Sequence, residues 1–189
     1  SGTSSGGGMV QAHAGRSTVH TGGAVVVTSG EGTATSSGVV LIRSSNSGEA
    51  GVSGSLLFSS GTSVTGNSGR VHMGTGAATA GRGGAVVVTV GSGTSGSGGL
   101  VQAHAGRSTV HTGGEVHVSS GEGTATSSGA ITIRSVNAGA AGTSGYLSFS
   151  SGSSVTGNSG YIHMGTGVAT AGRGGMVLIS VGSGTSSVG

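Results

Sequence analysis

Residues 10–23 read VQAHAGRSTVHTGG, and the same fourteen residues return at 101–114. Extended from this match, residues 9–98 align with 100–189 without a gap, and 67 of the 90 pairs are identical. A flexible Gly/Ser linker has no reason to keep its register over such a length. We therefore expect one continuous chain of two repeats offset by 91 residues, 9–99 and 100–189, after the end of a preceding unit at 1–8.

A shorter period, marked by glycine, lies inside each repeat. Twelve glycines recur at steps of fifteen or sixteen residues, and we name them the opening glycines because each begins a short apolar run. They are Gly8, Gly23, Gly38, Gly54, Gly69, Gly84, Gly99, Gly114, Gly129, Gly145, Gly160 and Gly175. In 69–74, GRVHMG, apolar side chains occupy the second and fourth positions after the glycine. This alternation predicts a β-strand with one buried face.

A second glycine follows each strand in most modules, and a Thr or Val comes shortly after it, as in GEGT at 30–33. We interpret this segment as a second, thinner strand with glycine at the corners, where glycine accepts positive φ and lets backbones approach. The prediction is an all-β fold, a β-solenoid (parallel β-helix-like) of about twelve coils of 15–16 residues. The extra residue of the longer coils, near 46–48 and 137–139, is expected in a bulge or longer corner. A hairpin meander is the structural alternative.

The two faces of the predicted strands differ in how they vary between the repeats. All six residues directly after an opening glycine differ, whereas the inward positions change only from Val to Ile. Close packing predicts this contrast between a core and an outer face. The predicted core columns are Val25, Val27, Val40, Ile42, Leu56, Phe58, Val71, Met73, Val86, Val88, Ile131 and Ile133. Val26, Arg43 and His72 are expected to point outward, and the core is expected to be dry.

The outer face of the first repeat is unusually apolar. Contiguous apolar surface is typical of an interaction site. The alternative explanation is that β-branched residues stand there because of their intrinsic preference for strands. The candidate lateral contact face consists of Met9, Val26, Val39, Leu41, Leu57, Val87, Tyr146 and Tyr161. We expect packing there against another copy or another part of the same chain.

The composition excludes several classes of chemistry. The chain has no Cys and no Pro, and its printed sequence contains no Asp and no Lys, so disulfides, cysteine metal sites and a Ser-His-Asp triad are absent. Only 6% of residues are charged and the net charge is +3. These few charges do not form the polybasic patch that a nucleic-acid-binding protein needs. No apolar run approaches the ~20 residues that span a bilayer. We expect no enzyme activity, no cofactor, no nucleic-acid partner and no membrane insertion.

Seven histidines are the candidate metal ligands or bases. His13, His20, His72, His104, His111, His117 and His163 make up the set. His104 and His117 would be neighbours on adjacent coils, but no third ligand accompanies them, and zinc needs three or four. Solvated outward histidines are therefore the expectation, and no metal site is predicted.

Two Gly/Ser-rich motifs, SVTGNSG at 63–69 and GAATAGRGG at 76–84, recur in the second repeat with one substitution between them. This pattern resembles the tandem repeats of large extracellular surface proteins of algae and related protists, and the resemblance covers the whole chain. It implies an extracellular structural role, in a hair, sheath or wall fibre, and no catalytic residues. O-glycans on the many Ser and Thr residues stay open as partners.

Ice binding is the main alternative function. The chain resembles flat ice-binding β-solenoids in its fifteen-residue period, and the TAT segments at 33–35 and 124–126 fit their Thr-x-Thr motif. The matching phase of neighbouring coils holds His20, Gly66, Gly81 and Gly96, which breaks the regular array. An adhesin stalk is a further alternative.

The sequence SGTS stands at both 1–4 and 183–186, so the chain begins and ends in the same phase of a coil. Unpaired strand edges at such ends template further pairing. We expect copies to stack head to tail as well as laterally. The predicted function is a structural repeat protein of an extracellular filament or surface fibre, built by stacking of β-coils.

Overall fold

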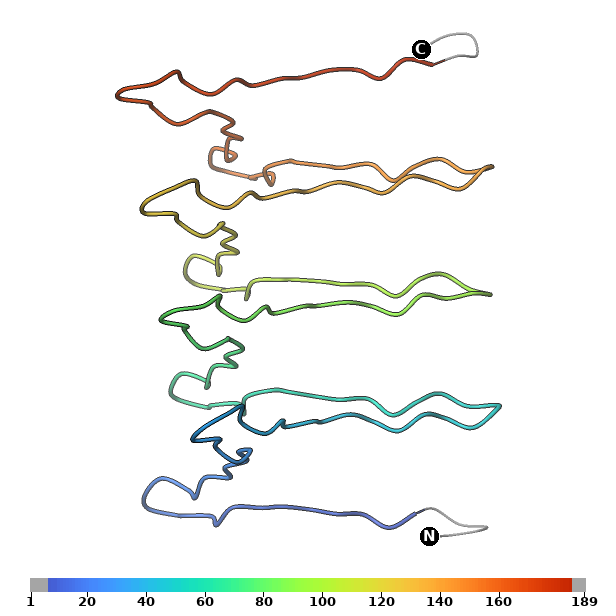
Figure 1. Ribbon diagram of the computed structural model, residues 1–189, viewed down its shortest axis with the longest axis vertical. Helices are drawn as coiled ribbons and strands as arrows, with labels where there is room; N and C mark the ends of the chain where they lie inside the picture. Colours follow the sequence, from blue (N-terminus) through green and yellow to red (C-terminus); the bar gives the residue numbers. More distant parts are fainter. Residues whose placement is uncertain (1–6, 185–189) are drawn as a thin grey trace. The chain divides into compact units, whose positions relative to one another are not determined.

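The computed structural model describes residues 7–184. Within this range the backbone forms no α-helix and no β-strand, and Figure 1 shows a plain trace without coiled ribbons or arrows. None of the hydrophobic side chains in this range is buried. The prediction of an all-β fold, a β-solenoid or β-helix of twelve coils, is therefore wrong.

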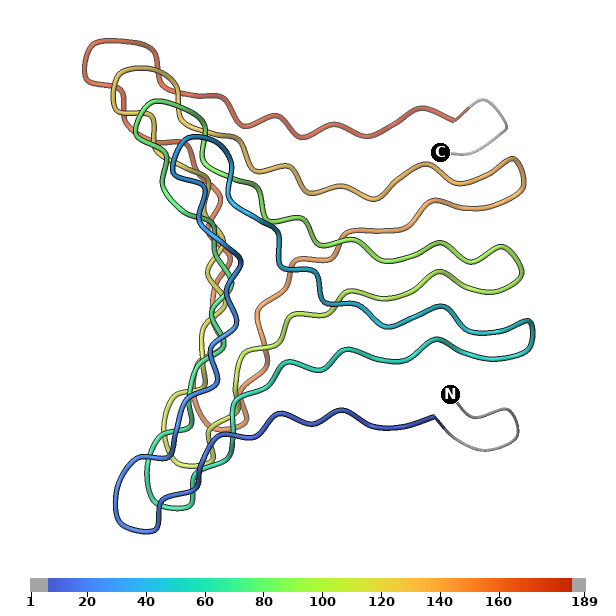
Figure 2. The ribbon, with the colours of Figure 1, turned by 60° about the horizontal axis from the view of Figure 1, so that its bottom comes forward.

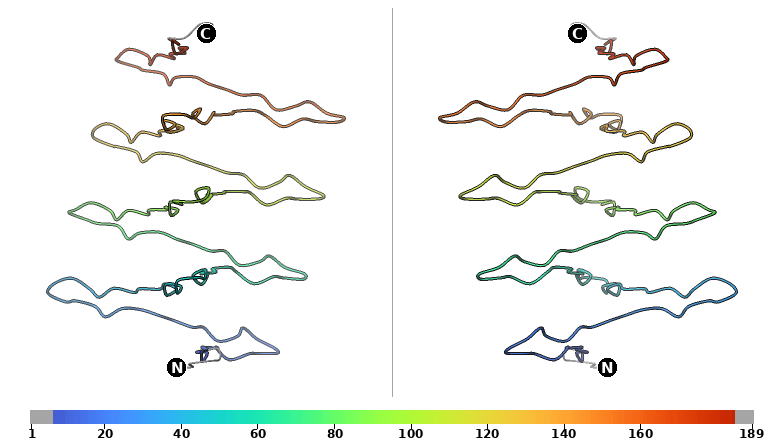
Figure 3. Two further views of the ribbon diagram at one scale, coloured as in Figure 1. Left: turned by 90° about the vertical axis from the view of Figure 1, so that its right-hand side faces the viewer. Right: turned by 90° about the vertical axis from the view of Figure 1, so that its left-hand side faces the viewer.

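The bends of the backbone nevertheless recur with the fifteen- or sixteen-residue period of the sequence. Extended runs alternate with loops in which the backbone bends, as the traces in Figures 1, 2 and 3 show. The bends lie fifteen or sixteen residues apart, at 18–20, 33–35, 49–51, 64–66, 79–81, 94–96, 109–111, 124–126, 140–142, 155–157 and 170–172. Each module thus contains one run and one loop. The bends fall in the segment where a second strand was predicted, and they begin at its Thr in the loops of Thr18, Thr33 and Thr79.

Each loop closes at a neck, where its opening glycine approaches the residue nine or ten positions earlier. A Cβ added to the eleven opening glycines from Gly23 to Gly175 would lie 3.1–3.7 Å from the Cβ of that earlier residue. The earlier residues, which we name the neck residues, are Ala14, Ser29, Ser44, Ser60, Thr75, Val90, Ala105, Ser120, Ser135, Ser151 and Thr166. All are small or β-branched, which permits the approach.

Close approach, rather than unusual dihedral angles, accounts for these glycines. None of the glycines in the described range has φ in the left-handed region. At Gly84, a methyl group would come within 3.1 Å of both the Cβ and the Cγ2 of Thr75. Of the two reasons that the sequence offered for glycine at the corners, only the approach of one chain segment to another applies here.

Hydrogen bonds at the loops recur in both repeats. The Gly23 N–H donates to the Gly15 carbonyl oxygen at 2.8 Å, and the Gly38 N–H donates to the Gly30 carbonyl oxygen at 2.9 Å. The bonds from Gly114 to Gly106 and from Gly129 to Gly121 repeat both at the same lengths. The Thr75 hydroxyl donates to the Gly84 carbonyl oxygen at 3.2 Å, and Thr166 repeats this toward Gly175 at 3.3 Å.

Serine side chains support every third loop. The Ser17 hydroxyl oxygen accepts the His20 N–H at 2.9 Å, and Ser63 accepts the Gly66 N–H at 3.0 Å. Ser108 and Ser154 do the same in the second repeat, at 2.9 and 3.0 Å. Such local bonds from a hydroxyl to nearby N–H groups favour turns over regular secondary structure.

The runs fail to form a sheet because little holds them together. Folded globular chains make about one hydrogen bond per residue. Residues 7–184 make five backbone–backbone bonds and ten that involve a side chain. Burial of the two inward apolar side chains of a module would have to offset the conformational entropy lost by its roughly fifteen residues. Glycine loses the most backbone entropy on ordering, and 46 of the 189 residues are glycine. The free energy gained by apolar burial is therefore too small to hold the runs in a sheet.

The structure divides into two halves, Ser1–Gly99 and Leu100–Gly189. The division falls between Gly99 and Leu100, where the two repeats of the sequence also meet. The predicted head-to-tail contacts involve residues 1–4 and 183–186, of which 1–4 and 185–186 lie outside the described residues.

Candidate interaction surface

Alternate side chains of a run share one side of it, although the run is not a strand. The Gln11 amide lies 3.1 Å from the Met9 Sδ, and the His13 Nε2 lies 3.3 Å from the Gln11 Oε1. In the second repeat, the His117 Nδ1 lies 3.9 Å from the Glu115 Oε1. These contacts join the first, third and fifth positions after an opening glycine. We name that side the outward side, following the sequence prediction, and the second and fourth positions the inward side.

The two sides differ in how much of each side chain is exposed. Leu57, on the outward side, is 81% exposed, whereas its neighbour Leu56 on the inward side is 50% exposed. Val39 and Val40 show the same contrast, with 86% and 47%. Because each pair consists of one residue type, the difference reflects the surroundings. The chain's own atoms cover the inward side more than the outward side, but they bury neither.

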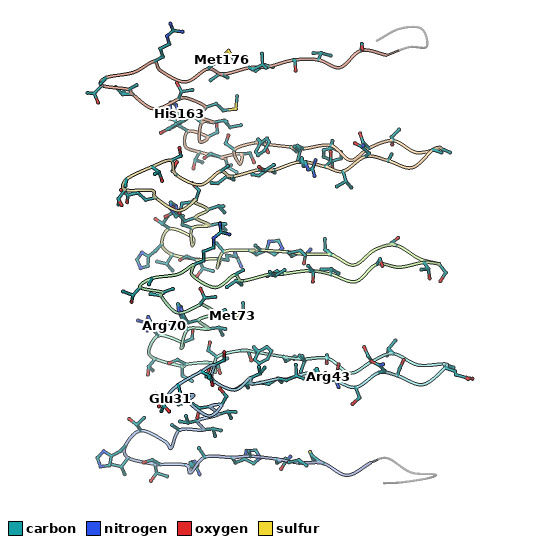
Figure 4. All side chains as sticks on the ribbon, viewed as in Figure 1. Glu31, Arg43, Arg70, Met73, His163 and Met176 are labelled. Atoms are coloured by element: carbon teal, nitrogen blue, oxygen red, sulfur yellow. The ribbon has the colours of Figure 1, made fainter. Side chains whose placement is uncertain are left out.

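All twelve predicted core-column residues are exposed in the structure. So are the eight residues of the candidate lateral contact face. Figure 4 shows side chains, among them Met73, Arg43 and Met176, that stand away from the ribbon along the runs. The surface that results is a series of short apolar stripes, one on each run, separated by loops of Gly, Ser and Thr.

The loops place the Thr pairs of the ice-binding hypothesis in bends. Thr33 and Thr35 lie in the bend at 33–35, and Thr124 and Thr126 lie in the bend at 124–126. A regular ladder of Thr side chains requires an extended backbone, in which alternate residues point the same way. The structure does not provide such a backbone at these four residues.

The histidines lie apart from other metal-ligating groups. Among residues 7–184, no three His, Cys, Asp or Glu side chains come together in a group that could hold a metal ion. His104 and His117, which the sequence analysis placed on adjacent coils, gain no third ligand within this range. The contacts of His13 with Gln11 and of His117 with Glu115 are local contacts between exposed side chains.

One hollow of about 360 Å³ lies at residues 134–137. Its lining consists of Arg134, Ser135, Val136 and Asn137, which are consecutive in the chain. A hollow lined by four consecutive residues is the inside of a backbone curve rather than a cavity between packed elements. It therefore offers no enclosed site for a small molecule.

No family model matches the chain, and no curated protein or solved structure is similar to it. None of the residues from 7 to 184 lies in a helix long and apolar enough to cross a membrane.

The sequence analysis missed the neck residues and the hydroxyl groups that support the loops. The signal was present, because the neck residues of the first repeat, nine or ten positions before an opening glycine, are Ala, Ser, Thr or Val and recur in the second. The Ser that accepts a loop N–H stands six residues before every third opening glycine, at Ser17, Ser63, Ser108 and Ser154. Both patterns become visible only when the modules are aligned on the glycines.

Proposed function

We propose that this chain is a structural repeat protein that forms part of an extracellular filament or surface fibre. Copies associate with one another, laterally and head to tail, through the apolar side chains of their runs. No catalytic role, cofactor, nucleic acid or membrane insertion is part of this proposal.

The apolar stripes on the runs support the proposal most directly. The chain exposes 18890 Å², more than twice the roughly 7,800 Å² of a folded monomer of its mass. A standard protein–protein interface buries about 1,600 Å². Apolar surface gains about 25 cal/mol per Å² when it leaves water. Association therefore has ample apolar surface to bury that the single chain leaves in water.

The distribution of charge favours contact between identical chains. Charged residues are 6% of the sequence and the net charge is +3, so copies repel one another weakly. Four of the seven Arg residues, Arg16, Arg82, Arg107 and Arg173, lie in loops rather than on the stripes. The stripes can thus meet without bringing many charges together.

An extracellular location rests on the resemblance to repeat proteins of algal and protist surfaces. A chain without Cys and Lys also offers few reactive groups to an exposed environment. The closed loops present Ser and Thr hydroxyls to solvent, and O-glycans there would leave the stripes free for contact.

Sedimentation velocity and negative-stain microscopy of the full chain over a range of concentrations test the proposal. We expect species much larger than 17.3 kDa, with elongated particles in the micrographs. A chain that stays monomeric at millimolar concentration would contradict the proposal. Antibodies raised against the 29–38 loop, applied to the native material, should label an extracellular fibre.

A triple variant, Val26→Thr, Leu41→Thr and Leu57→Ser, provides the matched comparison. These positions are polar in the second repeat, where His117, Thr132 and Ser148 stand. Because the single chain buries none of the three side chains, their replacement leaves its own conformation unchanged. We expect the variant to need a higher concentration for assembly. Equal assembly of variant and wild type would show that the outward side is not the contact.

A further inference from the structure

Tyr146 and Tyr161 differ from the other members of the candidate lateral contact face. The other six are Met, Val or Leu residues of the first repeat. The two tyrosines are the only ones in a chain that has no Trp, and they lie in consecutive modules, each directly after an opening glycine. The corresponding positions of the first repeat hold Ser55 and Arg70. A pair of outward aromatic rings is therefore particular to these two modules.

Both tyrosine rings lie open on the outward side of their runs. Tyr146 is 89% exposed and Tyr161 is 88% exposed, compared with about half for the inward residue that follows each of them. The His163 imidazole lies against Gly165, where an added Cβ would be 3.2 Å from its Nε2. The imidazole therefore extends along the run away from Tyr161. Each tyrosine ring presents its flat face to solvent.

Neutral polar groups follow each tyrosine on the same side of its run. Ser148 and Ser150 stand two and four positions after Tyr146, and His163 stands two positions after Tyr161. Residues 135–172 contain no Arg, Lys, Asp or Glu. The outward side of these two runs thus combines an aromatic ring with hydroxyl or imidazole groups and carries no carboxylate or guanidinium. Such a surface suits a ligand that is uncharged and rich in hydrogen-bonding groups.

The neck between the two runs limits the separation of the tyrosines. A Cβ added to Gly160 would lie 3.5 Å from the Ser151 Cβ. The path along the run from Tyr146 to Ser151, across the neck and on to Tyr161 is therefore at most about 27 Å between Cα atoms, whereas fifteen stretched residues span about 50 Å. A chain of several sugar rings spans this distance and can touch both tyrosines at once.

The chemistry of a sugar ring matches these groups. One face of the ring consists of C–H groups, which stack on an aromatic ring, and its rim consists of hydroxyls that donate and accept hydrogen bonds. Tyr supplies a large, rigid, amphipathic contact, and Ser supplies adaptable hydrogen bonding. A proline-rich segment also packs on tyrosine, but it docks in a groove lined by aromatic rings. Each of these runs offers a single outward ring and no groove.

We propose that the runs at 145–151 and 160–166 bind a neutral polysaccharide, with its sugar rings stacked on Tyr146 and Tyr161. Ser148, Ser150 and His163 bond to the sugar hydroxyls. This inference goes beyond the proposed function, because its partner is a sugar polymer rather than a second copy of the chain. It assigns the second repeat a ligand that the first repeat, with Ser55 and Arg70 at these positions, does not share.

Tyrosine fluorescence of the full chain tests the inference. Since the chain has no Trp and two Tyr residues, the emission reports these two rings alone. The titrations use hydroxyethyl cellulose, mannan and dextran as neutral probes and dextran sulfate as the charged comparison. They are made at a protein concentration at which sedimentation shows single chains. We expect a saturable change in emission with at least one neutral polymer, and salt should not weaken it because no charge takes part.

Single substitutions identify the contact. Tyr146→Ser introduces the residue of the first repeat, and Tyr161 then remains as the reporter. We expect this variant and Tyr161→Ala each to bind about tenfold or more weakly, because one of two linked contacts is lost. Phe149→Ser removes an inward ring from the same run and should stay within about twofold of wild type. The single chain buries none of these three rings, so the variants keep its conformation.

The other outcomes overturn the inference. An unchanged emission with all three neutral polymers would do so, as would equal affinity of the wild type and both tyrosine variants. A response to dextran sulfate alone that salt abolishes would assign the binding to arginines. A response to polyproline and to none of the sugars would assign the surface to a proline-rich partner. Chains that bind the polysaccharide but never assemble would overturn the proposed function and leave the polysaccharide site in place.

Discussion

The loops at 29–38 and 44–54 follow each other in the sequence, but only the second of them varies between the two repeats. The first loop is identical to its counterpart at 120–129 in every residue. The second differs from its counterpart at 135–145 at four of eleven positions. Composition does not explain the contrast, because both loops are rich in Gly and Ser.

A backbone hydrogen bond between the loop ends explains the contrast. The ends of the first loop are joined by the hydrogen bond from the Gly38 N–H to the Gly30 carbonyl oxygen, and Gly32 is packed against the Ser36 carbonyl group. The second loop contains the extra residue and turns at residues 49–50, and no backbone hydrogen bond joins its ends in this part of the described chain. In this pair of loops, residues thus stay constant where a backbone hydrogen bond joins the loop ends and vary where the neck closes without one.

The largest expected effect is at Gly32. A methyl group in Gly32→Ala would overlap the Ser36 carbonyl oxygen, so the backbone of the loop must shift. We expect the closed loop to lose about 1–3 kcal/mol. Since the chain has no cysteine, spin labels on Thr28→Cys and Val39→Cys can measure the opening as a longer distance. Gly30→Ala, which would meet nothing within 4 Å, is the control, and equal distances in the two variants would contradict the role of crowding.

A smaller effect is expected at Thr75. Thr75→Val keeps the shape of the neck residue but removes the hydroxyl that donates to the Gly84 carbonyl oxygen. An exposed hydrogen bond of this kind contributes about 0.5 kcal/mol. Labels at Gly74→Cys and Ala85→Cys should report a broader distance distribution in this variant. Thr75→Ser retains the hydroxyl and should behave like wild type, and a broadened distribution there would show that the methyl group closes the neck.

The smallest effect is expected in the variable loop. Gly48→Ala introduces a methyl group with nothing within 4 Å, so the folded geometry needs no adjustment. The substitution reduces the freedom of the open chain, which favours the existing conformation by at most about 0.4–1 kcal/mol. Labels at Arg43→Cys and Ser55→Cys should therefore give an unchanged or slightly narrower distribution. A clear widening would show that this loop is as tightly packed as the loop at 29–38.

The period of the chain could be predicted from its sequence, but the fold class could not. The opening glycines mark the modules in the structure as they do in the sequence, and the alternation in a run such as 54–58 separates a more exposed side from a less exposed one. Alternation specifies which side chains share a side of an extended backbone. It does not specify that neighbouring runs pair, because pairing depends on the balance between apolar burial and the ordering of a glycine-rich chain.

The constancy of residues was also open to two explanations. Val25 and Val27 are unchanged in the second repeat as Val116 and Val118, which fits a packed interior. The segment at 14–23 is equally unchanged, and its residues close a loop through Gly15 and Gly23. One sequence cannot separate packing from closure, since both forbid substitution. For the candidate contact face, the sequence indicates the residues but not how they meet a partner.

The closed necks also hold chain length that does not contribute to the extension of the molecule. Nine Cα-to-Cα steps separate Ser29 from Gly38, and their fully stretched contour is about 30 Å, yet the closed neck holds its two ends in near contact. A pull on a fibre built from such chains would open the weakest necks first and lengthen the molecule stepwise, while the runs stayed attached to their neighbours. When the load fell, the short bonds at the necks would close again. Glycine at fifteen-residue intervals would thus give the material extensibility that recovers, with loops that yield before the lateral contacts do.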